Sequence, residues 1–247
     1  MTDAWGTFPA RMGDHQAFIS FNEQYAQNAE NDPRTSLFSV RVTLARPSAD
    51  GLPTGDEFAE LTRIEDLLNA SITEKDGVQV GRITVDGHQD FLFYVPFDEA
   101  TAAELVDSLA DRTAYALEYA HQDDPHKDAY WQTLYPTDED RLLMRDMRVL
   151  KVLRQKGDAG DVARRVMHWA YFADPSDAHQ FAEWAEANGY LVESVAPTED
   201  GQSAVRFAHE GTMMLADITR HTLAIDREAR AFAGRYDGWE TSVEQAR

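Results

Sequence analysis

The stretch V-Q-V-G-R-I-T-V-D-G-H-Q-D-F-L-F-Y-V, residues 78–95, carries the strongest local structural signal in the chain. Two runs rich in β-branched and aromatic residues flank Asp86-Gly87, a dipeptide that suits the type I′ turn of a two-residue hairpin. The stretch therefore predicts two antiparallel strands joined by a tight turn. The elements on either side indicate which kind of sheet this hairpin belongs to.

The flanking segments predict a β-α-β-β-α-β order around this hairpin. Apolar residues at 58, 61, 64, 67 and 68 have the spacing of one helix face, and Asp98 is expected to cap a second helix. The predicted elements are strands at 36–44 and 113–120, helices at 57–68 and 99–110, and an additional strand at 17–22. This order is the split βαβ of a ferredoxin-like sandwich.

The second half of the chain repeats the order less completely. Its predicted elements are helices at 137–156, 178–190 and 213–232, and strands at 164–172, 191–196 and 202–208. Thr137 and Asp140 have capping-box spacing. Asp237-Gly238 is predicted to reverse the chain, so that W-E-T-S-V (239–243) supplies a fourth strand.

The expected fold class is α+β, with two ferredoxin-like α/β sandwich domains and mainly antiparallel sheets. We place the domains at 1–133 and 134–247. The polar stretch 121–140 contains Pro125 and Pro136 and interrupts the periodic segments on either side, so it is predicted to be the seam.

The composition bounds the function. The chain has 23 Lys and Arg against 44 Asp and Glu, a net charge of −21. Residues 1–133 hold 9 basic and 24 acidic residues, so most of the excess negative charge lies in the first half. Such a surface repels phosphate backbones and attracts basic protein segments, which argues against direct nucleic-acid binding. There is no cysteine, no membrane-length apolar run and no secretory signal at the N-terminus. We expect a cytoplasmic protein that does not bind membranes, and we leave the oligomeric state open.

No catalytic motif stands out. G-x-S-x-G, P-loop, G-x-G-x-x-G and H-E-x-x-H patterns are absent from the sequence. H-Q-D-D-P-H (121–126) contains metal-ligating residue types, but a loop with Pro125 does not hold them on one face, so a solvated linker is favoured. His168 lies among apolar residues of a strand and is interpreted as a core histidine with one hydrogen bond. We therefore predict no catalytic residue, no metal and no cofactor.

Two alternatives remain open. Aromatic residues around the seam are interpreted as packing between the domains in preference to a ligand pocket. A cleft between the domains would instead make the protein an enzyme or small-molecule binder, with His121, His126, Tyr130, Trp131 and His168 as candidates. Alternatively, two similar domains could present an extended sheet surface to a partner strand. A basic side of the helix at 137–156 is expected to stay solvated or to dock on the acidic first domain; it comprises Arg141, Arg145, Arg148, Lys151 and Arg154.

Residues from about 140 to the end resemble the RraB family, bacterial regulators that inhibit ribonuclease E. The resemblance is carried, in order, by R-V-L-K-V-L-R-Q-K-G-D (148–158), R-R-V-M-H-W-A-Y-F (164–172), F-A-E-W-A-E-A-N-G-Y-L-V (181–192) and Y-D-G-W-E-T (236–241). The resemblance implies a ferredoxin-like domain that acts by binding the basic scaffold region of a ribonuclease E-type partner. Small RraB proteins have strongly acidic ends, whereas here the acidity lies in the additional first half.

The first half resembles bacterial domain of unknown function family 695. The matching pieces are Trp5, G-L-P-T-G-D-E-F (51–58), L-T-R-I-E-D-L-L (61–68), V-G-R-I-T (80–84) and F-L-F-Y (91–94). This resemblance implies an architecture and no activity.

The candidate partner-binding residues lie in the closing motif. They are Tyr236, Asp237, Trp239 and Glu240. Trp239 is interpreted first as part of a packed edge strand, and otherwise as a binding hot spot. The favoured function is that of a non-enzymatic acidic regulator of a ribonuclease.

Overall fold

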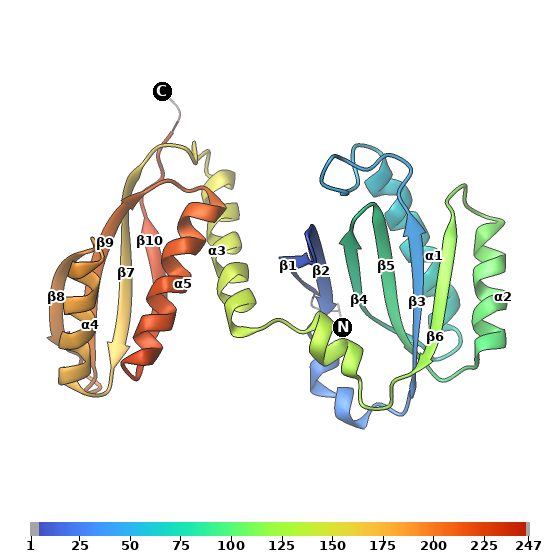
Figure 1. Cartoon of the computed structure of the whole chain (residues 1–247), viewed down its shortest axis with the longest axis horizontal. Coiled ribbons are helices and arrows are strands. Elements are labelled where there is room, and N and C mark those ends of the chain that lie inside the picture. The colour runs from blue at the N-terminus through green and yellow to red at the C-terminus, as the bar shows by residue number, and fades with distance from the viewer. Residues whose placement is uncertain (1–4, 246–247) are drawn as a thin grey trace. The chain divides into compact units, whose positions relative to one another are not determined.

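The computed structural model describes residues 5–245, and the chain divides into two compact units that meet between Asp140 and Arg141. Each unit contains an antiparallel sheet with α-helices, so the predicted α+β class with two sheet-containing domains is confirmed (Figure 1). Within the described residues, no helix is both long enough and apolar enough to cross a membrane.

The N-terminal domain is built on an antiparallel sheet whose strands are not in sequence order. Its strands are β1 (Trp5–Met12), β2 (His15–Asn22), β3 (Ser36–Thr43), β4 (Val78–Val85), β5 (His88–Val95) and β6 (Leu117–Asp123), and its helices are α1 (Glu57–Thr73) and α2 (Glu99–Ala110). Short helical turns lie at Tyr25–Gln27, Ala29–Asn31 and Tyr130–Leu134, the last of them π-helical. The sheet order is β1-β2-β4-β5-β3-β6. Each helical connection passes over one intervening strand, which is the predicted split βαβ arrangement.

The hairpin over residues 78–95 forms as predicted. Asp86 and Gly87 both have positive φ, 48° and 75°, as a type I′ turn requires. Two strand predictions need correction. β1 was not predicted, and the strand expected over 113–120 begins only at Leu117, because Arg112 and Thr113 still donate hydrogen bonds to carbonyls at the end of α2.

One face of this sheet is covered by α1 and α2 (Figure 1). The core between them is aliphatic and aromatic; it comprises Phe38, Val40, Val42, Leu44, Leu61, Ile64, Leu68, Ile72, Phe91, Phe93, Val95, Ala102, Val106 and Leu109. The predicted apolar face of α1 is thus confirmed except at Phe58, whose side chain is exposed.

The opposite face is covered by residues 124–135, which lie within the predicted seam. Tyr130 and Leu134 are fully buried in the N-terminal domain. The Tyr130 ring lies edge-on to Tyr25 with centroids 4.9 Å apart, and its hydroxyl donates to the carbonyl of Asn22 at 2.7 Å. The aromatic residues that were interpreted as packing between the domains thus cover an apolar sheet face of the N-terminal domain. The linker prediction for residues 121–126 is wrong, because residues 121–123 belong to β6 and Asp124 is buried.

Buried charges anchor the same stretch. The Lys127 side chain is enclosed, donates to the carbonyl of Arg34 and lies 4.7 Å above the Tyr94 ring. Asp124 accepts a 2.5 Å hydrogen bond from the Tyr94 hydroxyl. Burial lowers the pKa of Lys127. Each of these two buried charges thus has a polar or aromatic partner, as buried polar groups generally require.

The C-terminal domain contains a second split βαβ unit preceded by a long helix. Its elements are α3 (Asp138–Gln155), β7 (Arg164–Phe172), α4 (Pro175–Ala187), β8 (Leu191–Pro197), β9 (Ser203–Gly211), α5 (Leu215–Ala231) and β10 (Gly234–Thr241). The strand order is β10-β7-β9-β8, with each neighbouring pair antiparallel. The predicted capping box forms, since Asp140 Oδ2 accepts from the amide of Thr137 at 2.9 Å and Thr137 Oγ1 accepts in return from the Asp140 amide at 3.2 Å.

The closing strand exists, but the chain does not turn where the sequence predicted. It reverses directly after α5, where Ala233 has a φ of 53°. Asp237 and Gly238 instead form a bulge within β10, between the Tyr236–Ala170 and Gly238–Trp169 pairs. Gly238 has a φ of 142°, a conformation that suits glycine. The strand therefore starts five residues earlier than expected.

The packing of residues 130–134 on β4 generates a prediction at Gly81. A Cβ at this position would lie 2.4 Å from Leu134 Cδ1. We expect Gly81→Ala to lower the free energy of unfolding of the N-terminal domain by about 1–3 kcal/mol, the usual cost of overpacking. Urea unfolding measures this cost. In the double variant with Leu134→Ala, the loss of unfolding free energy should be smaller than the sum of the two single losses. The cavity left by truncating Leu134 accommodates the new methyl group at position 81. Full additivity would contradict the contact.

Candidate functional site

The closing strand β10 places the four candidate partner-binding residues in two different environments. Tyr236 is 2% exposed, and Trp239 is half-buried beside Leu150 and Val166. Asp237 and Glu240 are exposed. The aromatic members of the motif thus pack inside the domain, while the carboxylates face solvent.

A buried carboxylate fixes Trp239. Asp146 of α3 accepts a hydrogen bond from the indole Nε1 of Trp239 at 2.8 Å and one from the hydroxyl of Thr222 in α5 at 2.6 Å. Burial raises the pKa of Asp146, and these two hydrogen bonds partly oppose that shift. The Asp146 carboxyl group therefore ties together α3, α5 and β10.

Tyr236 joins a chain of buried polar side chains. Its hydroxyl lies 2.8 Å from Nδ1 of His168, and Nε2 of His168 lies 2.8 Å from Nδ1 of His209. A neutral imidazole has one donor and one acceptor nitrogen, so the hydrogen bonds must run in one direction along this chain. His168 is a core histidine, as predicted, but it makes two hydrogen bonds where one was expected.

The row of polar side chains that starts at Tyr236 continues towards the domain surface. The ring of His209 stacks on that of His221, with centroids 3.7 Å apart, and Nδ1 of His221 lies 2.9 Å from the hydroxyl of Tyr190. Nε2 of His209 is buried and has no hydrogen-bond partner among the described residues. Gly211 makes room for this ring, because a Cβ there would lie 2.8 Å from that nitrogen.

The electrostatics keep these imidazoles neutral. Burial lowers the pKa of His168 well below 6.5, and the neighbouring His209 and His221 lower it further. Burial also lowers the pKa of His209, to about 4, and that of His221. Neutral and largely enclosed, the cluster fits a structural role better than acid–base catalysis, which needs a group that reaches its substrate.

The face of the sheet opposite α4 and α5 carries a row of half-buried side chains. Trp169 and Tyr171 of β7 project from it, with Arg206 5.8 Å above the Trp169 ring and Arg235 5.4 Å above the Tyr171 ring. Arg206 Nε also contacts Glu193 at 2.9 Å. This face combines aromatic area with paired charges, and it differs in that respect from the apolar interior.

The residues proposed for an alternative cleft have separate roles. His121 hydrogen-bonds through Nε2 to the Phe97 carbonyl at 2.9 Å, and His126 is exposed. Trp131 packs edge-on to Tyr130, with centroids 5.1 Å apart. These four residues belong to the N-terminal domain, and His168 belongs to the core of the C-terminal domain. The structure therefore gives Tyr130 and His168 positions inside separate cores.

The remaining charged candidates are solvated or dispersed. The five basic residues along α3, predicted to share one side, are all exposed: Arg141, Arg145, Arg148, Lys151 and Arg154. Among residues 5–245, no group of three or more His, Asp or Glu side chains is arranged to hold a metal ion.

Sequence reasoning missed three members of the polar core, namely His209, His221 and Asp146. A signal existed for His209, because it follows Val205 and Phe207 at alternate positions of one strand. Asp146 interrupts the apolar positions of an amphipathic helix, and His221 does the same four residues before Ile225. That these positions meet follows only from the tertiary fold.

Comparison with known protein families gives a separate match for each half of the chain. The family described as "Family of unknown function (DUF695)" matches residues 3–135, and the family described as "Regulator of ribonuclease activity B" (RraB) matches residues 144–241. Both resemblances inferred from the sequence are thereby confirmed. A search of curated proteins found no match.

Two solved structures are distantly similar. One is an unknown protein from Galdieria sulphuraria, at 8% identity over 85% of this chain and 99% of that chain, with a TM-score of 0.23. Another is a putative glycine cleavage system transcriptional repressor, at 9% identity over 84% of this chain and 98% of that chain, with a TM-score of 0.24.

The Asp146 site predicts the effect of Trp239→Phe. The variant keeps an aromatic ring but removes the indole donor, which leaves one oxygen of a buried carboxyl group without its partner. We expect the free energy of unfolding of the C-terminal domain to fall by about 1–3 kcal/mol. Urea unfolding tests this, with Trp169→Phe on the partly exposed face as the matched control. A loss no larger than that of the control would show that the indole donor contributes nothing.

The histidine cluster predicts acid sensitivity. Its imidazoles are held neutral in the folded state, whereas those of the unfolded chain take up protons near pH 6.5. The stability that these neutral imidazoles contribute should therefore be complete above pH 6.5, and the free energy of unfolding should fall as the pH drops towards 4. Asp146, whose pKa is raised, acts in the opposite direction and reduces the slope.

Urea midpoints at a series of pH values, followed by the indole N–H signal of Trp239, measure this slope. His209→Asn removes one titrating ring and should make the slope shallower. An unchanged slope in this variant would exclude His209 as a contributor.

Proposed function

The chain belongs to the DUF695 family, and we propose that it is a non-enzymatic regulatory protein whose C-terminal domain binds a ribonuclease. The finer proposal is that the partner is a ribonuclease E-type enzyme, that contact is made with a basic segment of its scaffold region, and that binding changes RNA decay in the cytoplasm. The observation that carries the proposal is the RraB match over residues 144–241.

The arrangement of the C-terminal domain supports a binding role. The matched residues extend from α3 to the end of β10, so the match covers the complete sheet. The polar groups that could have suggested catalysis, His168 and Asp146, have their hydrogen bonds directed to other side chains inside the domain. A domain of this kind acts on a partner through its surface.

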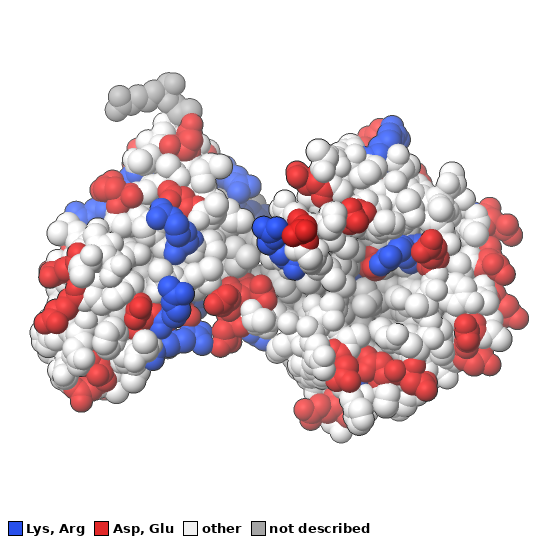
Figure 2. Space-filling model, viewed as in Figure 1, with Lys and Arg blue, Asp and Glu red and all other residues white. Residues whose placement is uncertain are grey.

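Charge complementarity supports a basic partner. In the N-terminal domain, acidic side chains gather on the part of the surface that carries α2, at the right of Figure 2. The exposed acidic residues of this helix and its ends are Asp98, Glu99, Glu104, Asp107 and Asp111. Surfaces of one sign steer partners of the opposite sign and accelerate their association.

In the C-terminal domain we assign the contact to the exposed carboxylates of β10. Asp237 and Glu240 are solvent-exposed on an edge strand of the sheet, close to the buried Tyr236 and the half-buried Trp239. Those two aromatic residues hold the strand in register, and the two carboxylates offer acceptors to Lys or Arg of the partner. Asp237 already pairs with Arg235, so a partner guanidinium would compete with that ion pair.

Binding of the purified full chain to the scaffold region of a ribonuclease E-type enzyme tests the proposal. We expect association by isothermal titration calorimetry at about 50 mM salt and a markedly weaker Kd at about 300 mM, because screening shortens the range of charge interactions. The rate of RNA cleavage by the ribonuclease should change in the same titration. No association at low salt, where a short RraB protein binds, would refute the proposal.

Two variants locate the contact. Asp237→Asn and Glu240→Gln should each raise Kd by about two- to fivefold, the effect of losing one exposed charge pair at an interface. Glu199→Gln in the β8–β9 turn is the matched control, since it removes one exposed carboxylate elsewhere in the domain. Equal effects of all three variants would indicate a response to net charge, without a contact at β10.

A further inference from the structure

The N-terminal domain has a pocket where its sheet extends beyond the helix that covers it. The β1–β2 hairpin adds two strands next to β4, whereas α1 lies over the neighbouring part of the sheet. The pocket lies between α1, the loop at 51–55 and the β1–β2 hairpin, and its volume is about 400 Å³. That volume is within the range of small-molecule sites, about 300–1,000 Å³.

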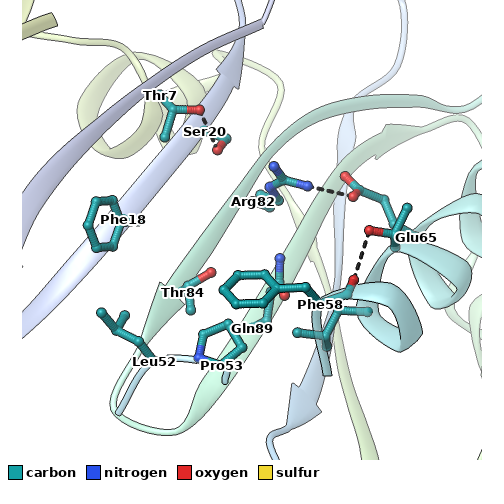
Figure 3. Close-up of a pocket in the computed structure, with 12 residues that line it drawn as sticks. Thr7, Phe18, Ser20, Leu52, Pro53, Phe58, Glu65, Arg82, Thr84 and Gln89 are labelled. Atoms are coloured by element: carbon teal, nitrogen blue, oxygen red, sulfur yellow. Dashed lines mark hydrogen bonds and ion pairs between the residues drawn. The ribbon is translucent and has the colours of Figure 1, made fainter. Parts of the chain in front are cut away.

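One end of the pocket is apolar. Phe18 of β2 and Phe58 of α1 lie on opposite sides of it, and Leu52 and Pro53 of the loop close the lower end in the view of Figure 3. Phe58 is 58% exposed, although it belongs to the run of apolar residues that predicted α1. Together with Phe18, Leu52 and Pro53, it gives the pocket an apolar lining of the kind that small-molecule sites have.

The other end is polar and is held by a chain of hydrogen bonds. Arg82 Nη1 donates to Glu65 Oε2 at 2.6 Å, and Glu65 Oε1 accepts from Gln79 Nε2 at 2.7 Å (Figure 3 shows the Arg82–Glu65 pair). Asn69 in turn donates to Gln79 Oε1 at 2.8 Å. Side chains from α1 and β4 therefore fix the position of the Arg82 guanidinium at the pocket wall, as supporting hydrogen bonds do in preorganised sites.

Arg82 retains binding capacity after this pairing. A guanidinium has five N–H donors in a planar fork, and the Glu65 contact uses one of its terminal nitrogens. The Arg82 side chain is 38% exposed, while that of Glu65 is 14% exposed and has both oxygens engaged. Thr84 and the hydrogen-bonded pair Thr7–Ser20 add hydroxyl groups to the same lining.

We propose that this pocket binds a small amphipathic carboxylate, with its apolar body between Phe18 and Phe58 and its carboxylate on Arg82. Guanidinium and carboxylate match in geometry, so one such group on a ligand fits the free edge of the fork. Ligands with several negative charges are disfavoured, because Glu65 lies beside Arg82 and the domain carries excess acidic residues. The proposal is independent of ribonuclease binding.

A displacement assay on the full chain tests the proposal. Anilinonaphthalene sulfonate, an aromatic anion that fluoresces in apolar sites, is the reporter, and phenylpropanoate and its amide are the competitors. The two competitors have the same shape and differ in the charge of the head group. We expect phenylpropanoate to displace the reporter at concentrations about tenfold lower than the amide does. Equal potency of the two competitors would overturn the assignment of a carboxylate ligand.

Variants connect this result to the pocket. Phe58→Ala changes an exposed position, so folding should be preserved, and we expect the Kd of phenylpropanoate to rise about tenfold. Leu191→Ala, at a 60% exposed leucine of the C-terminal domain, is the matched control and should have no effect. Arg82→Gln should abolish the preference for the carboxylate over the amide. Binding that is unchanged in both pocket variants would overturn the proposal.

Amide NMR shifts of the wild-type chain give a measurement that needs no variant. Phenylpropanoate should shift signals of residues 52–58 and 82–89 at a common midpoint. Saturable shifts confined to other parts of the chain would place the ligand elsewhere and refute the site.

Discussion

Both domains depend on one constraint, which is that the two crossover helices of a split βαβ unit lie on the same face of its sheet. Crossovers of one hand place both helices on one side, so the opposite face has to be covered by something else or tolerate water. In the N-terminal domain, residues 124–135 cover it with Tyr130 and Leu134. In the C-terminal domain the face stays half-exposed, and Trp169 and Tyr171 lie under arginine side chains.

Polar groups inside the C-terminal domain give its closing strand a unique register. Tyr236 and Trp239 each carry one hydrogen-bonding atom, and their partners, His168 and Asp146, are buried on β7 and α3. A slip of one residue would move both aromatic side chains to the other face of the sheet and leave buried groups unpaired. The bulge at Gly238 is what brings both side chains to the inner face. The closing motif, residues 236–241, therefore makes hydrogen bonds inside the domain and also positions the exposed carboxylates of Asp237 and Glu240.

The sequence predicted local features well and spatial ones poorly. Hairpin chemistry at Asp86-Gly87 and the capping box at Thr137 depend on neighbours in the chain, and both formed. The aromatic residues of the seam were interpreted as packing between the domains, whereas they cover a sheet face of the N-terminal domain, because that face is built from strands distant in the sequence. Arg82 and Phe58 gave no sign of a common pocket, since the pocket forms between α1, the loop at 51–55 and the β1–β2 hairpin, and this arrangement follows only from the tertiary fold.

The position of β10 in the chain affects when each domain can fold during synthesis. The N-terminal sheet has all of its strands once Asp123 has been added, and its second face is covered by Leu134. The C-terminal sheet needs Gly234–Thr241 as an edge strand on β7, which ends at Phe172, so about 70 further residues must be synthesised before this neighbour of β7 is complete. Until Thr241 leaves the ribosome, a chaperone or a sister chain would find β7 with an unpaired edge.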